Sequence, residues 1–263
     1  MIEQTASTRP DPTERFSDRA LAYASGRPGY PPQIGAHLGR ELGLAPGALI
    51  ADLGSGTGLS SRIFLAAGFR VIGVEPNAQM RAIAEADLAG NPGFRSVGGS
   101  AQRTTLDDAS VDCIAAAQSF HWFDIPAARA EALRILRRPA NAALIWNVRR
   151  MQDSPFAQGF EQLLLRYGNE YPQIRERHTD EASISGFFGA THWRRTDFDN
   201  RTELDFGLLV ARVESTSYLP AARDPAHAPM MEALRELFDA SQRDGKVVMQ
   251  YDTRVYAGTI VGT

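Results

Sequence analysis

The sequence predicts an α/β protein with a doubly wound, mainly parallel seven-stranded sheet and an added helical cap. Short apolar runs alternate with helix-like stretches between residues 48 and 148. The runs lack a polar face, which is typical of strands buried on both sides, and a glycine-rich turn follows the first run. Ligands of such sheets lie beyond the carboxyl ends of the strands, so one cleft is expected there.

The first three strands are expected at residues 48–53, 69–75 and 94–98, each a short run of apolar and β-branched residues. A helix between the first two ends at Gly68, a residue type that favours the position after a helix. Asn77 is expected to begin the next helix, because its side chain accepts hydrogen bonds from the first free amides.

The fourth and fifth strands are expected at residues 111–118 and 141–148. Asp124 is expected to begin the helix between them. The arginine pair at 137–138 is expected in its last turn, where positive charge favours the helix dipole, before Pro139 ends the helix.

The rhythm changes after residue 150, where an aromatic-rich helical stretch is followed by a strand, a helix and a last strand. The expected organisation is one domain with one cleft, preceded by a short polar tail. Its segments are a flexible tail at 1–14 and a single domain at 15–263, divided into lid helices at 15–45, a cofactor-binding core at 46–150, a helical cap insertion at 151–195, and C-terminal strands and a helix at 196–263 that complete the sheet.

Composition narrows the function classes. The chain of 263 residues is 43% hydrophobic and 22% charged, as is usual for a globular protein, and it has no apolar run that could span a bilayer. A net charge of −3 gives no reason to expect nucleic acid or a membrane as partner. The single cysteine, Cys113, excludes an internal disulfide, and the scattered histidines predict no metal site. A cytoplasmic location is expected, and monomer or homodimer stays open.

The glycine turn carries the strongest chemical signal. Gly54, Gly56 and Gly58 follow a G-x-G-x-G spacing, whereas a dinucleotide turn places its third glycine one residue later. Asp52 precedes the turn, and its carboxylate would repel a pyrophosphate but attract an ammonium group. Glu75 ends the next strand, where an acid binds ribose hydroxyls. A ribose, no phosphate and a cationic amino-acid tail describe S-adenosylmethionine.

Three stretches, "ADLGSGTGLSS", "VIGVEPNAQM" and "GSAQRTTLDDASVDCIAAAQSFHWFD", resemble motifs of the class I S-adenosylmethionine-dependent methyltransferases. The resemblance extends from Phe16 to Gly258 and implies a Rossmann-like fold, methyl transfer, and S-adenosylhomocysteine as product. The stretches "YASGRPGYP", "SFHWFD", "STSYLP" and "YDTRVYAG" are similar to a small-molecule branch that includes trans-aconitate methyltransferase-like proteins.

The resemblance also implies cofactor-binding roles for residues in the loops after the strands. Two of these residues have an alternative role: Met80 in the interior of a helix and Arg27 at the surface. Gln102 stands where relatives often carry an acid. The implied contacts are Gly54, Ser55, Gly56, Thr57 and Gly58 with the methionine part, Asp52 with its amino group, Arg27 with its carboxylate from a lid that also holds Tyr23, Glu75 with the ribose, Pro76, Met80, Ser100, Ala101 and Gln102 with the adenine, and Gln118 and Ser119 with the sulfonium side.

Residues at the methyl end of the cleft are candidates for contact with the acceptor. His121 is the candidate general base, needed only where the acceptor loses a proton, and its alternative role is to hold the lid or the following helix. Trp122 is a candidate pocket wall. Arg149 or Arg150 is expected to bind a carboxylate or phosphate of a small-molecule substrate.

Three other functions stay open at this stage. An NAD-dependent oxidoreductase is disfavoured by the glycine spacing and by Asp52. A nucleic-acid or protein methyltransferase is disfavoured because the chain has no basic groove signature, and adenine-N6 enzymes carry an [Asp/Asn]-Pro-Pro-aromatic turn where this chain has Gln118 to His121. A protein that binds S-adenosylmethionine without catalysis is the third, because methyl transfer needs no diagnostic side chain.

Overall fold

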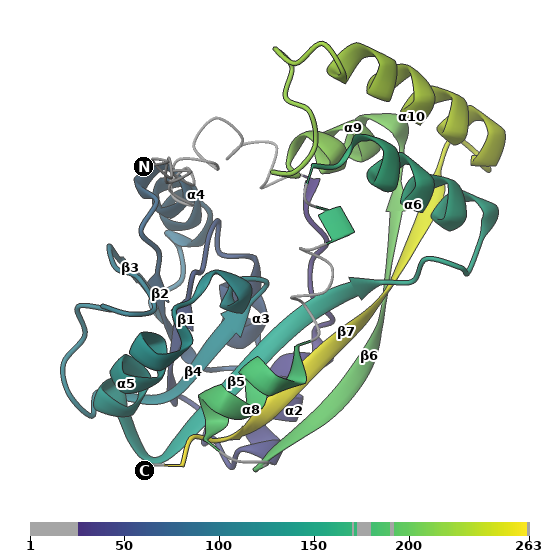
Figure 1. Cartoon of the computed structure of the whole chain (residues 1–263). Helices are drawn as coiled ribbons and strands as arrows, with labels where there is room; N and C mark the ends of the chain where they lie inside the picture. Colours follow the sequence, from purple (N-terminus) through teal and green to yellow (C-terminus); the bar gives the residue numbers. More distant parts are fainter. Residues whose placement is uncertain (1–25, 170, 173–179, 190–191, 262–263) are drawn as a thin grey trace, which may run out of the picture.

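The computed structural model describes residues 26–169, 171–172, 180–189 and 192–261, and its centre is a seven-stranded sheet of order β3-β2-β1-β4-β5-β7-β6 (Figure 1). Strands β1 to β5 pair in parallel, and β7 is antiparallel to both of its neighbours. This confirms the predicted fold class. The strands are β1 Leu49–Leu53, β2 Arg70–Val74, β3 Phe94–Val97, β4 Val111–Ala117, β5 Leu136–Arg149, β6 Trp193–Leu204 and β7 Val247–Thr259.

Helices cover both faces of the sheet, because alternate residues of the buried strands point to opposite sides. In β1, Ile50 belongs to the apolar cluster beneath two helices, whereas Ala51 and Leu53 belong to the cluster on the other face. The helices of the first face are α2 Gln33–Glu41 and α3 Leu59–Ala66, those of the second are α5 Ile125–Ile135 and α8 Glu181–Phe188, and α4 Ala78–Leu88 lies beside β3.

The predicted helix starts are confirmed, and one predicted end is wrong. The Asn77 side chain accepts hydrogen bonds from two amides of α4, and Asp124 accepts one from Ala127 at 3.2 Å. However, α5 ends at Ile135, so the arginine pair 137–138 lies in β5. Arg137 there donates to Asp112 of the paired strand at 2.8 Å, so cross-strand pairing replaces the expected helix-end role.

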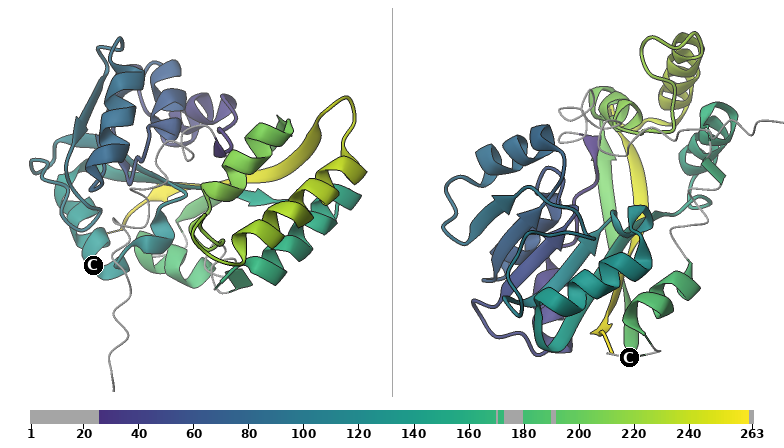
Figure 2. Two further views of the ribbon diagram at one scale, coloured as in Figure 1. Left: turned by 90° about the horizontal axis from the view of Figure 1, so that it is seen from above. Right: turned by 60° about the vertical axis from the view of Figure 1, so that its left-hand side comes forward.

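Strands β5, β6 and β7 are unusually long and connect the sheet to a separate group of helices. These helices are α6 Pro155–Tyr167, α9 Phe206–Glu214 and α10 His227–Ser241. Figures 1 and 2 show them gathered at the far ends of β6 and β7, away from α4 and α5. Their apolar side chains form one buried cluster with Met249 and Tyr251 of β7, and we call this unit the helical cap.

The helical cap is assembled from segments that are far apart in the sequence. Between α6 and α9 the chain returns to the sheet, where Phe187 and Phe188 of α8 pack in the same cluster as Ala128 of α5. The stretch 151–195 therefore supplies α6 to the cap and α8 to the sheet face. None of the helices in the described ranges has the length and apolarity needed to cross a membrane.

Candidate active site

The glycine turn after β1 has a backbone that only glycine adopts without strain. Gly54, Gly56 and Gly58 have φ values of 68°, 56° and 84°. A Cβ added to Gly54 would lie 2.7 Å from Cβ of Ser119, which follows β4. The absence of a side chain therefore lets the first turn and the end of β4 approach each other at the carboxyl edge of the sheet.

Glu75 connects the end of β2 to this turn. Its carboxylate accepts hydrogen bonds from the Gly56 amide at 3.0 Å and the Asn77 amide at 2.9 Å, one on each oxygen. Burial raises the pKa of Glu75, and these two hydrogen bonds oppose that rise. Because each carboxylate oxygen accepts more than one hydrogen bond, acceptor capacity remains for the hydroxyl pair of a ribose.

Asp52 lies beneath the turn and is fully buried. One carboxylate oxygen accepts hydrogen bonds from the Ser60 and Ser61 hydroxyls, each at 2.7 Å. Burial raises the pKa of Asp52 to about 6, against these two hydrogen bonds. The hydrogen-bonded oxygen therefore contacts the start of α3, whereas the other carboxylate oxygen, Oδ1, is buried and has no hydrogen-bond partner among the described residues.

The residues predicted around the adenine follow β2 and β3. Pro76 is exposed beside Glu75, whereas Met80 is buried on α4. Ser100 pairs with Arg103 in a short turn that also contains Gln102 and the buried Ala101. The structure therefore brings these residues to the same edge of the sheet as Glu75, with Met80 also part of the helix interior.

The end of β4 is held in a strained conformation. Gln118 has a φ of 56°, which is rare for a residue with a side chain, and its side-chain oxygen accepts a hydrogen bond from the Asn147 amide at 3.1 Å. Ser119 donates to the Leu53 carbonyl at 2.7 Å. These bonds fix the ends of three neighbouring strands relative to each other.

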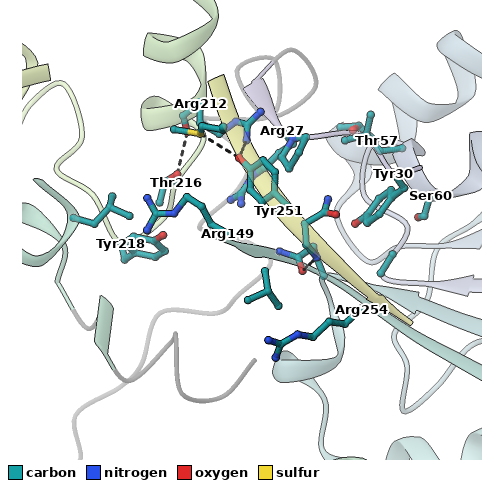
Figure 3. Close-up of a pocket in the computed structure, with 18 of the residues that line it drawn as sticks. Arg27, Tyr30, Thr57, Ser60, Arg149, Arg212, Thr216, Tyr218, Tyr251 and Arg254 are labelled. Carbon is teal, nitrogen blue, oxygen red and sulfur yellow. Dashed lines mark hydrogen bonds between the residues drawn. The ribbon is translucent and has the colours of Figure 1, made fainter. Parts of the chain in front are cut away.

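A cavity of about 490 Å³ extends from the glycine turn to the helical cap (Figure 3). The sheet edge contributes one wall and the cap and the segment before α2 contribute the others. The lining residues are Arg27, Pro28, Tyr30, Gly54, Ser55, Thr57, Leu59, Ser60, Ala117, Gln118, Asn147, Val148, Arg149, Met151, Phe160, Leu164, Tyr171, Arg212, Thr216, Tyr218, Met249, Tyr251 and Arg254.

The turn side of this cavity fits the methionine part of S-adenosylmethionine. The Thr57 hydroxyl is buried and has no hydrogen-bond partner among the described residues, which is expected of a group that receives a ligand. It lies next to Ser60 and the glycine turn, where backbone can approach a ligand closely. Glu75 is not part of the cavity lining but accepts a hydrogen bond from the turn, where it would hold the ribose, and Gln118 lines the cavity.

The described residues before α2, 26–32, cover one side of the cavity. The carbonyl of Gly29 accepts hydrogen bonds from the side-chain amides of Asn147 at 3.1 Å and Asn200 at 2.8 Å. Arg27 lines the cavity and donates to the Ser215 carbonyl of the cap at 3.1 Å. Tyr23, the other predicted lid residue, lies outside the described residues.

The two arginines after β5 lie in different surroundings. Arg149 lines the cavity, where it donates to Glu161 and, at 2.8 Å, to Tyr171. Arg150 lies outside the cavity lining and binds Asp252 and Asp199. The alternation of side chains along a strand explains why neighbours in sequence separate in this way.

His121 and Trp122 are neighbours in the short helix η2, Phe120–Trp122, with ring centroids 4.8 Å apart. Neither belongs to the lining of the cavity in the described part of the chain. The structure therefore does not bring these two rings to the wall shared by Arg149 and the glycine turn.

Sequence reasoning assigned no role to several residues that line the cap side of the cavity: Arg212, Thr216, Tyr218, Tyr251 and Arg254. Four of them stand in "STSYLP" and "YDTRVYAG", so a signal existed in the motifs. Arg212 lies just before the first of these motifs, on α9.

This chain is similar in sequence to known methyltransferases. Residues 51–143 match the model of a methyltransferase domain. An uncharacterised methyltransferase of Schizosaccharomyces pombe is 29% identical over 234 residues, which cover 87% of this chain and 90% of the relative. One from Mycobacterium bovis is 35% identical over 144 residues, and this chain spans about half of its length, 56%.

Solved structures share the fold. A candidate type II methyltransferase from Anaeromyxobacter dehalogenans has a TM-score of 0.65 at 24% identity, over 90% of this chain and 99% of its own. A candidate methyltransferase from an antibiotic biosynthesis pathway of Anabaena variabilis has a TM-score of 0.60 at 18% identity. The match covers 90% of this chain and 99% of that protein. With the glycine turn and the acid after β2, the matched domain indicates an S-adenosylmethionine-dependent methyltransferase similar to the class I enzymes, and the solved structures agree in fold.

Proposed function

We propose that the protein methylates a small organic molecule held between the glycine turn and the helical cap. The observation that carries this proposal is the cavity of about 490 Å³, which joins the two regions and has the size of a small-molecule site. S-adenosylmethionine, when bound, supplies a methyl group on a positively charged sulfur. Aromatic residues such as Tyr30, Phe160 and Tyr218 line the acceptor space and exclude water from it.

Arg149, rather than Arg150, is our candidate for contact with the acceptor. One nitrogen of its guanidinium, Nη1, is buried without a hydrogen-bond partner among the described residues, while the other is held by Glu161 and Tyr171. This fixed orientation suits recognition of a polar or anionic group by the remaining N–H donors. Arg150 is already surrounded by the carboxylates of Asp252 and Asp199.

The first experiment uses methyl-labelled S-adenosylmethionine with fractionated metabolites. Transfer of label to a molecule small enough for the cavity supports the proposal, and transfer only to protein or nucleic acid contradicts it. Binding of S-adenosylhomocysteine without transfer to any fraction favours the alternative of a non-catalytic binding protein. NAD binding in its place favours an oxidoreductase.

The two arginines are then compared with the acceptor so identified. Arg149→Gln is expected to raise the Michaelis constant for the acceptor about tenfold or more, whereas Arg150→Gln serves as the matched control. Equal Michaelis constants for Arg149→Gln and the unchanged protein would remove Arg149 from the site.

A further inference from the structure

Arg212 is a buried cation that forms no ion pair with a carboxylate among the described residues. Its side chain is 7% exposed. Its hydrogen bonds in the described structure go to neutral oxygens, the Gly26 carbonyl and the Tyr251 hydroxyl. A guanidinium has five N–H donors, so most of its donor capacity is left for another group.

Other positive charges surround the same space. Burial lowers the pKa of Arg212, and the charges of Arg27 and Arg149 lower it further, whereas Tyr251 opposes them. Arg149 is balanced by Glu161, whereas the cavity lining contains no carboxylate for Arg212 among the residues that the structure describes. Burying a charge without a partner is costly, so an anionic occupant would stabilise this arrangement.

Neutral donors complete the surroundings of Arg212. Figure 3 shows Tyr251 directly beside it, with Thr216 and the head of Arg149 on the cap side of the cluster. The Thr216 hydroxyl donates to the Arg212 carbonyl at 3.0 Å and Tyr251 donates to the sulfur of Met249 at 3.2 Å. The first bond satisfies a backbone carbonyl at the end of α9, and the second orients the Tyr251 hydroxyl that accepts a hydrogen bond from the Arg212 guanidinium.

We propose that Arg212 binds an oxyanion, a carboxylate or phosphate group, of the methyl acceptor and thereby selects an anionic substrate. This inference rests on the proposed function and names the substrate class of the same cavity. Arg212 acts through the N–H groups of its planar guanidinium, which match the two oxygens of such a group. Arg149 supplies a second positive charge, moderated by Glu161.

The test measures binding of simple anions to the complete chain in the presence of S-adenosylhomocysteine. Succinate and inorganic phosphate are the anionic probes and succinamide is the neutral counterpart of succinate. At least one anion is expected to bind ten times more tightly than succinamide, and Arg212→Gln is expected to abolish that preference. Equal binding of all three probes overturns the inference.

Two further variants separate recognition from folding. Tyr251→Phe keeps the charge of Arg212 but removes the hydroxyl that orients it, and a severalfold loss of anion affinity is expected. Arg201→Gln removes an exposed arginine of β6 and is the matched control, with unchanged anion affinity. If Arg212→Gln lowers affinity for S-adenosylhomocysteine as much as for the anion, Arg212 serves the cofactor and the inference fails.

The source of the oxyanion is identified with the labelled methyl donor. Metabolites are divided by anion exchange at neutral pH into anionic and neutral pools, and label is expected only in the anionic pool. Loss of the acceptor after phosphatase treatment identifies a phosphate, and its persistence a carboxylate. Label in the neutral pool overturns the inference, whereas a failure to bind S-adenosylhomocysteine at all would instead overturn the proposed function.

Discussion

The sheet core and the helical cap are built in different ways from the same chain. In the core, β1, β2 and β3 are consecutive neighbours and β4 pairs with the other side of β1, so the loops after β1, β2 and β4 begin at one edge of the sheet. In the cap, α6 packs against α10, which begins sixty residues after α6 ends (His227 against Tyr167). Local order therefore builds the cofactor side, and long-range packing builds the acceptor side.

This difference between core and cap matches two separate tasks, binding of the cofactor and binding of the methyl acceptor. The cofactor is common to all class I methyltransferases, and its turn is made from backbone and a few fixed residues. The proposed acceptor side is lined by side chains of β5, β7 and the cap, such as Arg149, Tyr251 and Arg212. Changes in the cap can thus alter the acceptor space while the cofactor turn is preserved.

The largest expected effect is on stability and comes from a substitution that disrupts only the packing of the cap. Leu234 of α10 is fully buried in the cap cluster, and α10 contributes no residue to the cavity lining in the described ranges. Leu234→Ala is expected to lower the free energy of unfolding by about 2–5 kcal/mol through a cavity in the cap. Affinity for S-adenosylhomocysteine is expected to stay within about threefold, since the turn is untouched.

Urea denaturation and calorimetry measure the two quantities. Leu165→Ala is the matched control, because this leucine of α6 is 45% exposed and its loss leaves no buried void. A large loss of cofactor affinity in Leu234→Ala would show that the core and the cap are not separable.

The next largest effect is on cofactor affinity and comes from a substitution that disrupts only the glycine turn. Gly54→Ala is expected to weaken S-adenosylhomocysteine binding about 100-fold or more, because the alanine must adopt a φ of 68° and its Cβ would lie 2.7 Å from Ser119. Gly43→Ala is the control, with a φ of 63° and no atom within 4 Å of the added Cβ. Similar affinities for the two variants would contradict the close approach of turn and β4.

A smaller effect concerns the acid after β2. Glu75→Gln keeps the shape of the side chain but removes its charge. It also removes one of the two oxygens that accept hydrogen bonds from the amides of Gly56 and Asn77. Affinity for S-adenosylhomocysteine is expected to fall about 10–100-fold, the value of a charged hydrogen bond. Glu85→Gln on the exposed face of α4 is the control, and an unchanged affinity of Glu75→Gln would remove this residue from the site.

The smallest effect is a pH dependence of stability that comes from the core. Because the folded pKa of Asp52, about 6, lies above its ordinary value of 3.8, its stabilising contribution is complete below pH 4. That contribution is lost as pH rises through 6, by about 1–1.5 kcal/mol between pH 5 and 7.5.

Asp52→Asn is expected to remove this part of the pH dependence in urea denaturation of the cofactor-free protein. Asp87→Asn, an exposed carboxylate paired with Arg62, is the control and should leave the dependence unchanged. An identical pH profile for Asp52→Asn and the unchanged protein would mean that Asp52 is not buried as the structure has it.

Several features were predictable because their physical cause is local. The strands, the helix starts at Asn77 and Asp124 and the glycine turn each depend on residues within a few positions of one another. The end of α5 was not, because the pairing of β5 with β4 outweighed the preference of the arginine pair 137–138 for a helix end.

The sequence by itself determined the fold class, the family and the cofactor turn, since alternating apolar runs and glycines act through short-range geometry. Only the tertiary structure decided which arginines line the cavity. It directed Arg149 into the cavity and Arg150 away from it, and it brought Arg212 beside Tyr251, thirty-nine positions along the chain. Such contacts arise when the cap packs on the long strands, and no local pattern encodes them.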